Sequence, residues 1–172
     1  MLRDMVRDFA RNEVKPLAQE LDEKGGFPHE SVKKMAELGL MGIPWDEKYG
    51  GTGMDTMALV IAIEEIGKVC PSTSATMMAH TSLGTAPIAV FGTEEQKERY
   101  LPGLLSGKKI GAFGLTEPNA GSDAGNTQTR AILKGNEFIV NGEKAFCTNA
   151  GEAPVIIFTD VMVENGEEKG IY

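Results

Sequence analysis

The chain has 172 residues, of which 17 are Lys or Arg and 25 are Asp or Glu, giving a formal net charge of −8. This acidic balance argues against nucleic acid or an anionic membrane surface as the main partner. No apolar run is long enough to cross a bilayer. Cys70 and Cys147 are too few for a disulfide framework or a thiolate zinc site, and no metal site is expected. The length allows one domain or parts of two, and the cysteine content fits a reducing compartment.

The first 108 residues carry the periodicity of amphipathic helices. Pro16 is expected to kink the first helix or to divide it in two, and Gly25-Gly26 is expected to end it. Pro28 suits the first turn of a second helix. The buried stripe of that second helix is expected to consist of four apolar side chains: Val32, Met35, Ala36 and Leu40.

Three further helices have recognisable start signals. Asp55 is a good N-cap for a third helix. Ser72 or Thr73 is expected to open a fourth, which runs toward Phe91 and is apolar or small on nearly every face, as in the central helix of a bundle. Thr93 opens a capping-box pattern, so a short polar helix is expected after it. The inward residues of the third helix are expected to be Leu59, Val60, Ile63 and Ile66.

From Ile110 onward the pattern changes to that of strands. Asn141-Gly142 is the strongest short hairpin signal, and Asn165-Gly166 predicts a second turn. A pairing is also expected between residues 127–134 and 137–140 across Gly135-Asn136. The predicted strands are Ile110–Thr116, Thr127–Lys134, Glu137–Val140, Glu143–Thr148 and Val155–Phe158, with Gly170–Tyr172 as the opening of another.

The predicted fold is therefore α+β and multidomain. Residues 1–108 form an all-α helical bundle, and residues 109–172 form the start of an antiparallel, β-barrel-like domain. Such a set of strands would leave a long open edge, which natural β domains seldom expose. We therefore expect the β domain, and the chain, to be incomplete at the C-terminus.

The sequence contains none of the common nucleotide-binding, zinc-protease or dithiol patterns. His80 lies in the apolar fourth helix and is expected to be a hydrogen-bonded structural histidine, whereas His29 is expected to be solvated. Glu64 and Glu65 are adjacent on a helix and so point in different directions. They are expected to belong to a solvated face.

Two segments remain as candidates for chemistry. The first, residues 112–123, is a strand that runs into a loop rich in small residues, hydroxyls and free N–H groups, so it can approach a flat ring or a phosphate closely. In the second segment, residues 144–149, strand alternation would place Phe146 and Thr148 on one face, where they can pack on a ring and hydrogen-bond its edge. Cys147 would then point the other way, as a buried inert thiol. An ordinary β loop and a routine core aromatic are the structural alternatives.

Together these segments resemble the acyl-CoA dehydrogenase family. The resemblance runs in order through the whole chain and is too extended for a chance match. It rests on four segments: Trp45-x-x-x-Tyr49-Gly50-Gly51-x-Gly53, Phe91-Gly92-Thr93-x-x-Gln96-Lys97, Leu115-Thr116-Glu117-Pro118-x-Ala120-Gly121-Ser122-Asp123, and Asn141-Gly142-x-Lys144 followed by Phe146-Cys147-Thr148-Asn149. Within the family, these motif segments look most similar to those of the short-chain, butyryl-CoA dehydrogenases.

The resemblance implies an FAD enzyme that oxidises an acyl-CoA to the trans-2-enoyl-CoA. It implies that Thr116 donates to the flavin pyrimidine edge, that Thr148 lies near flavin N5, and that Ser122 contacts both the pyrophosphate and the pantetheine arm. Position 146 often holds Trp in the family, so Phe146 keeps the packing and lacks the indole N–H. The implied cofactor residues are Phe113, Leu115, Thr116, Gly121, Ser122, Phe146, Cys147 and Thr148. The implied substrate residues are Ser122, Thr76, Ala79, His80 and Leu83.

The family's catalytic base is a glutamate in a C-terminal helical domain, and nothing before Tyr172 matches it. The resemblance therefore implies that this domain is absent, that the chain holds no catalytic residue, and that it is inactive alone. It further implies electron-transferring flavoprotein as the electron acceptor, a homotetramer for the intact protein, and a bacterial cytoplasmic location, with the mitochondrial matrix as the alternative. Two other hypotheses remain open: an acyl-CoA oxidase-like flavoenzyme, and a non-catalytic binding module.

Overall fold

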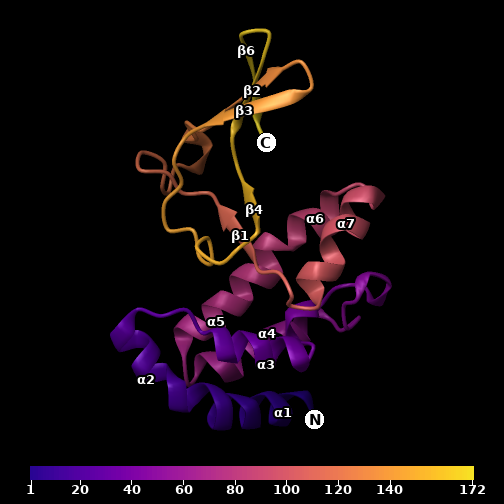
Figure 1. Cartoon of the computed structure of the whole chain (residues 1–172), viewed down its shortest axis with the longest axis vertical. Coiled ribbons are helices and arrows are strands. Elements are labelled where there is room, and N and C mark those ends of the chain that lie inside the picture. Colours follow the sequence, from indigo (N-terminus) through magenta and orange to yellow (C-terminus); the bar gives the residue numbers. More distant parts are fainter.

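The computed structural model describes all residues from 1 to 172. Helices occupy one end of the molecule, where the N-terminus lies, and strands occupy the other (Figure 1). None of the helices is both long and apolar enough to span a membrane. The helices are α1 (Leu2–Phe9), α2 (Lys15–Lys24), α3 (His29–Glu37), α4 (Thr56–Gly67), α5 (Pro71–Met78), α6 (Ala86–Phe91) and α7 (Glu94–Leu105). The predicted α+β class, with the helices first, is confirmed.

The predicted helix boundaries follow from local capping. The Asp55 carboxylate accepts a hydrogen bond from the N–H of Ala58 at the start of α4. Thr93 and Gln96 form the reciprocal capping box of α7. Gly25, with φ of 61°, ends α2 in the left-handed conformation that glycine adopts without strain. The sequence alone predicted all three of these helix ends.

Two π-helical turns interrupt what would otherwise be longer helices. The first, Ala10–Val14, lies directly before α2, so the predicted division of the first helix near Pro16 is confirmed. The second, Ala79–Gly84, separates α5 from α6. The prediction of one continuous fourth helix opened by Ser72 or Thr73 is therefore wrong, since α5 begins at Pro71 and ends at this wider turn. Such turns often accompany functional sites.

The main core lies between the long helices of the first half. Leu59 and Ile66 on α4 are buried in it as predicted, whereas Val60 is half-exposed, so its predicted inward position is wrong. A second, smaller cluster joins α6 to α7 through Ile88, Leu101, Leu104 and Leu105. The fully buried residues of the main core include Val6, Val14, Met35, Ile66 and Met77.

An ion-pair network joins α1 to α4. Only 2% of the Glu65 surface is exposed, and its carboxylate accepts hydrogen bonds from Arg3 at 2.6 Å and from Arg7 at 3.0 Å. Hydrogen bonds from Arg7 and Lys68 are the main reason that the pKa of Glu65 falls to about 2. The prediction that both Glu64 and Glu65 belong to a solvated face is wrong for Glu65. Glu64 remains exposed, as predicted, but its carboxylate meets the same Arg3 Nη1 and Lys68 Nζ as that of Glu65, so the prediction that the two point in different directions is also wrong.

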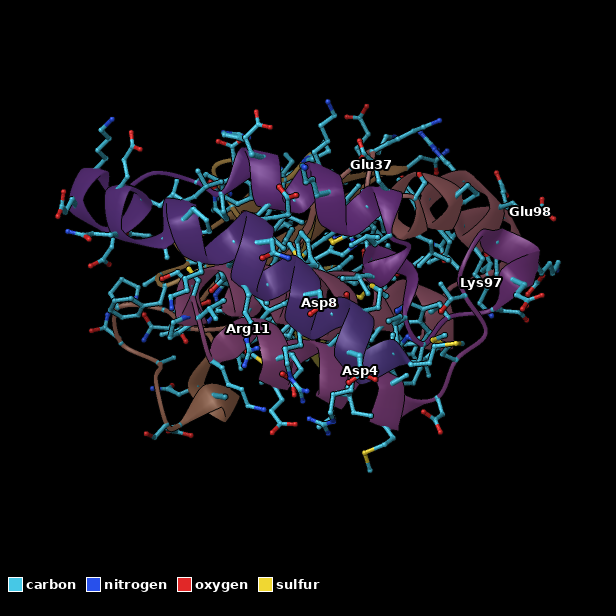
Figure 2. All side chains as sticks on the ribbon, turned by 90° about the horizontal axis from the view of Figure 1, so that it is seen from below. Asp4, Asp8, Arg11, Glu37, Lys97 and Glu98 are labelled. Atoms are coloured by element: carbon cyan, nitrogen blue, oxygen red, sulfur yellow. The ribbon has the colours of Figure 1, made fainter.

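The outer face of the helical layer is charged. Figure 2, viewed from below Figure 1, shows Asp4, Asp8 and Arg11 along the first helical segment. In the same view, Glu37 on α3 lies at the upper right and Glu98 on α7 lies at the right. These side chains carry a mixture of signs, as is usual for a solvated helical surface.

The strands form two small sheets: one in the order β1-β4 and one in the order β3-β2-β5-β6. The β2-β3 and β5-β6 pairs are antiparallel, whereas β1-β4 and β2-β5 are parallel. The four-stranded sheet is therefore mixed and the two-stranded sheet is parallel, so the prediction of an antiparallel domain is wrong. The strands are β1 (Gly111–Gly114), β2 (Arg130–Lys134), β3 (Glu137–Asn141), β4 (Val155–Phe158), β5 (Val161–Glu164) and β6 (Glu167–Ile171).

Two of the predicted turns in this half are confirmed and one is wrong. Gly135 lies in the turn between β2 and β3, and Asn165-Gly166 joins β5 to β6, each with a positive φ. Asn141-Gly142 forms no hairpin, and residues 143–148 form no strand. Gly142 instead packs against Thr129, where a Cβ would lie 2.2 Å from the hydroxyl oxygen. The predicted strand opening at residues 170–172 is also wrong, because Gly170 and Ile171 end β6.

Candidate functional site

The loop after β1 is held by a buried carboxylate. The side chain of Glu117 accepts hydrogen bonds from the backbone N–H groups of Gln128 at 2.6 Å and Thr129 at 3.0 Å. Lys144 Nζ lies 2.6 Å from Glu117 Oε1, and also donates to the Thr159 hydroxyl at 3.2 Å. Because Glu117 and Lys144 belong to the two candidate segments, this ion pair ties one segment to the other.

The electrostatics of Glu117 follow from these contacts. Burial favours the neutral form and so raises the pKa, but the hydrogen bonds from Lys144 and from the backbone outweigh it and bring the pKa to about 2. Glu117 is therefore an anion at neutral pH with its oxygens already occupied. A carboxylate in that state is a poor proton acceptor, so its role is to hold the loop.

The second segment adopts an irregular turn. Phe146 has φ of 54°, and 94% of its surface is exposed. A left-handed conformation is unfavourable for a bulky residue and signals a locally constrained backbone. The strand alternation predicted for Phe146 and Thr148 therefore does not apply, although both side chains do reach the surface. The Ala145 N–H donates to Thr116 O at 2.8 Å, which keeps this turn beside the first loop.

The remaining cofactor-site candidates lie on the same two segments. Leu115 is 38% exposed, and Phe113 and Thr116 are half-buried. Gly121 and Ser122 are exposed, and a Cβ added to Gly121 would meet no atom within 4 Å. No backbone hydrogen bond uses the N–H of Thr116, Gly121, Ser122 or Thr148. The two segments thus present free donors next to exposed apolar side chains.

Cys147 was predicted to be buried, but it is only half-buried, with its side chain turned toward β1. Its Sγ contacts Phe113 O at 3.2 Å, with the thiol as donor, and burial raises its pKa. A thiol whose pKa is raised carries little thiolate at neutral pH, so it is a weak nucleophile. Cys147 therefore links the turn to β1 through its side chain.

His80 is completely buried in the π-helical turn. Its Nδ1 accepts the Gly111 N–H at 2.9 Å, so the prediction of a hydrogen-bonded structural histidine is confirmed. Desolvation lowers its pKa to about 4, against the opposing effect of the carbonyl groups of Leu104 and Met41. The imidazole is therefore neutral at pH 7, with the proton on Nε2.

The substrate-site candidates are on α5 and the turn that follows it. Thr76, Ala79 and His80 are buried, and Leu83 is exposed. Ser122 lies apart from them in sequence, on the loop after β1. Contact of these residues with a substrate stays a prediction.

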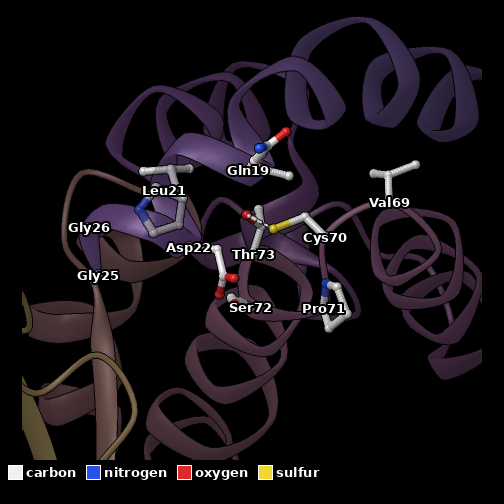
Figure 3. A pocket seen from close by; sticks show the side chains of 12 residues that line it. Gln19, Leu21, Asp22, Gly25, Gly26, Val69, Cys70, Pro71, Ser72 and Thr73 are labelled. Carbon is white, nitrogen blue, oxygen red and sulfur yellow. Dashed lines mark hydrogen bonds between the residues drawn. The ribbon is translucent and has the colours of Figure 1, made fainter.

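The cavity drawn in Figure 3 lies elsewhere. It has a volume of about 470 Å³ and is lined by the end of α2 and the start of α5, including Leu21, Asp22 and Ser72. The Thr73 hydroxyl donates to Cys70 Sγ at 3.1 Å in its wall. None of its lining residues is among the sequence-predicted site residues, and the exposed segments described above remain the candidate site.

Three residues that organise the site received no role from the sequence. Glu117 and Lys144 form the ion pair between the segments, and Asn149 is buried between α5 and β1. All three lie within the segments that resemble the family motifs, and this position was the only indication in the sequence that they could matter. Their partners are remote in sequence, so the contacts themselves were not predictable from local pattern.

The chain matches two family models in succession. Residues 1–108 match the acyl-CoA dehydrogenase N-terminal domain, and residues 112–171 match the acyl-CoA dehydrogenase middle domain. It is 53% identical to the probable acyl-CoA dehydrogenase YngJ of Bacillus subtilis, over 99% of this chain and 45% of that protein. It is 50% identical to a short-chain specific acyl-CoA dehydrogenase of Clostridium acetobutylicum, over the same shares of the two chains. The chain thus spans less than half the length of these relatives.

Solved structures show the same similarity. Butyryl-CoA dehydrogenase from Megasphaera elsdenii superposes with a TM-score of 0.88 at 39% identity, over 93% of this chain and 43% of the other. An acyl-CoA dehydrogenase from Bacillus anthracis, solved in complex with FAD, gives 0.87 at 36% identity over 99% and 30% of the two chains. The ordered motifs, the fold and both domain matches agree, and the chain belongs to the acyl-CoA dehydrogenase family.

Proposed function

We propose that the full-length protein is an FAD-dependent acyl-CoA dehydrogenase that converts an acyl-CoA to the trans-2-enoyl-CoA. The observation that carries this proposal is the donor-rich surface formed by the two motif segments and held together by Glu117 and Lys144. The family membership and the FAD-bound relative support it. The relatives that act on short thioesters favour a short acyl chain such as butyryl.

The residues on this surface fit FAD. Leu115 and Phe146 offer exposed apolar area for a flat ring, and the N–H groups of Thr116 and Thr148 have no internal partner. Gly121 leaves its surroundings open, so a pyrophosphate can approach the backbone there. Lys144 is engaged with Glu117, so the donors available in these segments are neutral.

Bound FAD supplies the acceptor for the hydride that leaves the substrate β-carbon. This chain's own residues bind and orient. The Thr116 N–H and hydroxyl would donate to the pyrimidine edge, where negative charge develops, and fixed neutral donors stabilise such charge. Thr148 would donate near N5, Ser122 would hold the pyrophosphate and the pantetheine arm, and Phe113, Cys147 and Phe146 would shape the ring's surroundings.

The substrate α-proton needs a carboxylate base over the α-carbon. Glu117 is buried in an ion pair, with its pKa held at about 2, and cannot serve. We propose that the base lies in a part of the full-length protein beyond this chain. The 172-residue chain is then inactive by itself, with residues 1–108 and 109–172 as its two domain portions.

Thr76, Ala79, His80 and Leu83 are proposed to form one wall of the acyl pocket. Leu83 is exposed and the other three residues are buried, so Leu83 would face the acyl chain and the other three would support it. Electron-transferring flavoprotein is the proposed acceptor, and a homotetramer is the proposed assembly of the intact protein. The bacterial relatives favour the cytoplasm over the mitochondrial matrix as the location.

A steady-state assay tests the proposal. The full-length protein is loaded with FAD and given saturated acyl-CoA thioesters of increasing chain length, with electron-transferring flavoprotein or oxygen as the acceptor. Enoyl-CoA formation that is fastest with a short thioester and requires the flavoprotein supports the proposal. Faster turnover with oxygen would make the protein an oxidase, and absence of enoyl-CoA with every thioester would refute the activity.

A further inference from the structure

Both backbone polar groups of one residue in β1, Gly111, form hydrogen bonds with side chains. The N–H of Gly111 donates to Nδ1 of His80 at 2.9 Å, and its carbonyl accepts from Nδ2 of Asn149 at 3.3 Å. The same Nδ2 also donates to the carbonyl of Thr76 on α5, at 3.0 Å. We call these four residues the Gly111 junction. It joins the turn after Cys147, the strand β1 and the helix α5.

The chemistry of Asn149 fixes its orientation. Both neighbouring groups, Thr76 O and Gly111 O, are carbonyls and only accept, so the amide must turn its NH2 group toward them. Oδ1 is buried and has no donor partner. Only 9% of the Asn149 surface is exposed, and its φ is 71°. Asn149 thus combines a left-handed backbone conformation, which Asn adopts more readily than most other non-glycine residues, with a buried amide whose oxygen has no partner.

The two halves also approach closely beside the junction. A Cβ on Gly84 would lie 2.5 Å from the carbonyl carbon of Gly111, so the π-helical turn touches the β1 backbone directly. That turn carries Ala79, His80 and Leu83, and the residue before Asn149 is Thr148. A shift at Asn149 therefore moves the turn of α5 relative to the Phe146–Thr148 segment.

We propose that Asn149 is a positioning residue that sets the distance between the acyl-pocket turn of α5 and the flavin-binding segment Phe146–Thr148. This proposal rests on the proposed function. Asn149 itself touches neither substrate nor cofactor, since its polar atoms are buried and its donors are used by Thr76 and Gly111. It acts through Thr148, the adjacent residue, and through the Gly111 junction.

The first test replaces Asn149 by Gly in the full-length, FAD-loaded protein. Glycine adopts a positive φ without strain, so Asn149→Gly removes the two hydrogen bonds and leaves the backbone conformation accessible. Asn165→Gly is the matched control, because Asn165 also has a positive φ, of 52°, but is exposed in the β5-β6 turn. Amide hydrogen exchange is followed in residues 76–84 and 111–116. We expect faster exchange in both segments for Asn149→Gly and in neither for the control. Unchanged exchange in either segment would overturn the proposal.

The second readout separates positioning from simple loss of structure. A misplacement of about 1 Å costs roughly a hundredfold in rate, so the single-turnover rate of flavin reduction by butyryl-CoA should fall about ten- to a hundredfold in Asn149→Gly. FAD content and the KM for butyryl-CoA should change much less. A rate loss that only parallels the loss of FAD would overturn the proposal. If the wild-type flavin is not reduced at all, the proposed function fails and the exchange comparison alone decides the positioning role.

A third variant adds a pH profile. In Asn149→Asp, the neutral carboxyl keeps one donor toward the two carbonyls, whereas the ionised carboxylate has none. We expect the reduction rate to fall with rising pH in this variant relative to wild type. A profile parallel to wild type would contradict the proposal. If Asn149→Gly does not fold, Asn149→Asp at low and high pH provides the same exchange comparison.

Discussion

Lys144 Nζ lies 2.6 Å from Glu117 Oε1, with 13% and 4% of the two side chains exposed. The residues are far apart in sequence, and each belongs to one of the segments that form the candidate FAD surface. Removing one member of a buried ion pair leaves the other charge uncompensated, which costs more than replacing both. The pair is therefore the main electrostatic link within the site.

Lys144→Met is expected to lower the free energy of unfolding by about 3 kcal/mol and to weaken FAD retention. Glu117→Gln in the same background should restore part of the stability, because no buried anion then remains. Denaturant titration and the bound-FAD ratio measure both effects. Lys169→Met, which breaks the exposed pair with Glu167, is the control and should change little. Equal effects of Lys144→Met and Lys169→Met would contradict this account.

His80 makes stability depend on pH. Its pKa is held at about 4 in the folded state by burial, against an ordinary value of 6.5. Above pH 6.5 the group is neutral in both states and contributes nothing. As the pH falls from 6.5 toward 4, only the unfolded state takes up the proton, so stability declines, by about 2 kcal/mol at pH 5.

Denaturant unfolding at pH 7 and pH 5 tests this dependence. His80→Gln, which retains an acceptor for the Gly111 N–H, should reduce the difference between the two pH values. An undiminished pH dependence in His80→Gln would show that other groups cause it.

Phe146 is expected to matter for the cofactor and not for the fold. Its ring is exposed and its backbone is left-handed, so Phe146→Gly removes no core contact and relieves the strain. We expect the unfolding free energy without FAD to change by less than about 1 kcal/mol, while FAD binds at least tenfold more weakly. Phe138→Ala on β3, also exposed, serves as the control for loss of a surface aromatic. Unchanged FAD affinity in Phe146→Gly would remove Phe146 from the site.

Two glycines give a matched comparison. A Cβ at position 84 would overlap the Gly111 backbone, whereas a Cβ at position 121 would meet nothing. Gly84→Ala should therefore destabilise the protein by about 3 kcal/mol or more, as overpacking does where backbone cannot move. Gly121→Ala should leave the thermal midpoint unchanged and weaken FAD binding. A stable Gly84→Ala variant would contradict the observed approach of the π-helical turn after α5 to β1.

Local signals predicted the helical half well because the capping residues act within one turn. Asp55 and Thr93 cap α4 and α7 as expected, and Gly25 ends α2. The errors arise from tertiary contacts. Asn141-Gly142 forms no hairpin, and Gly142 lies against Thr129 instead. The parallel β1-β4 pairing joins segments with no shared local pattern. The two motif segments do lie side by side, but through an irregular turn and a buried ion pair that only the structure shows.

The most direct measurement is an anaerobic one. The full-length protein, loaded with FAD, is mixed with stoichiometric butyryl-CoA, and the visible absorbance of the flavin is followed together with the thioester product. The account predicts loss of the oxidised-flavin absorbance with formation of the trans-2-enoyl thioester, while the 172-residue chain gives no product. An unchanged flavin spectrum in the full-length protein with every saturated thioester tested would contradict the account.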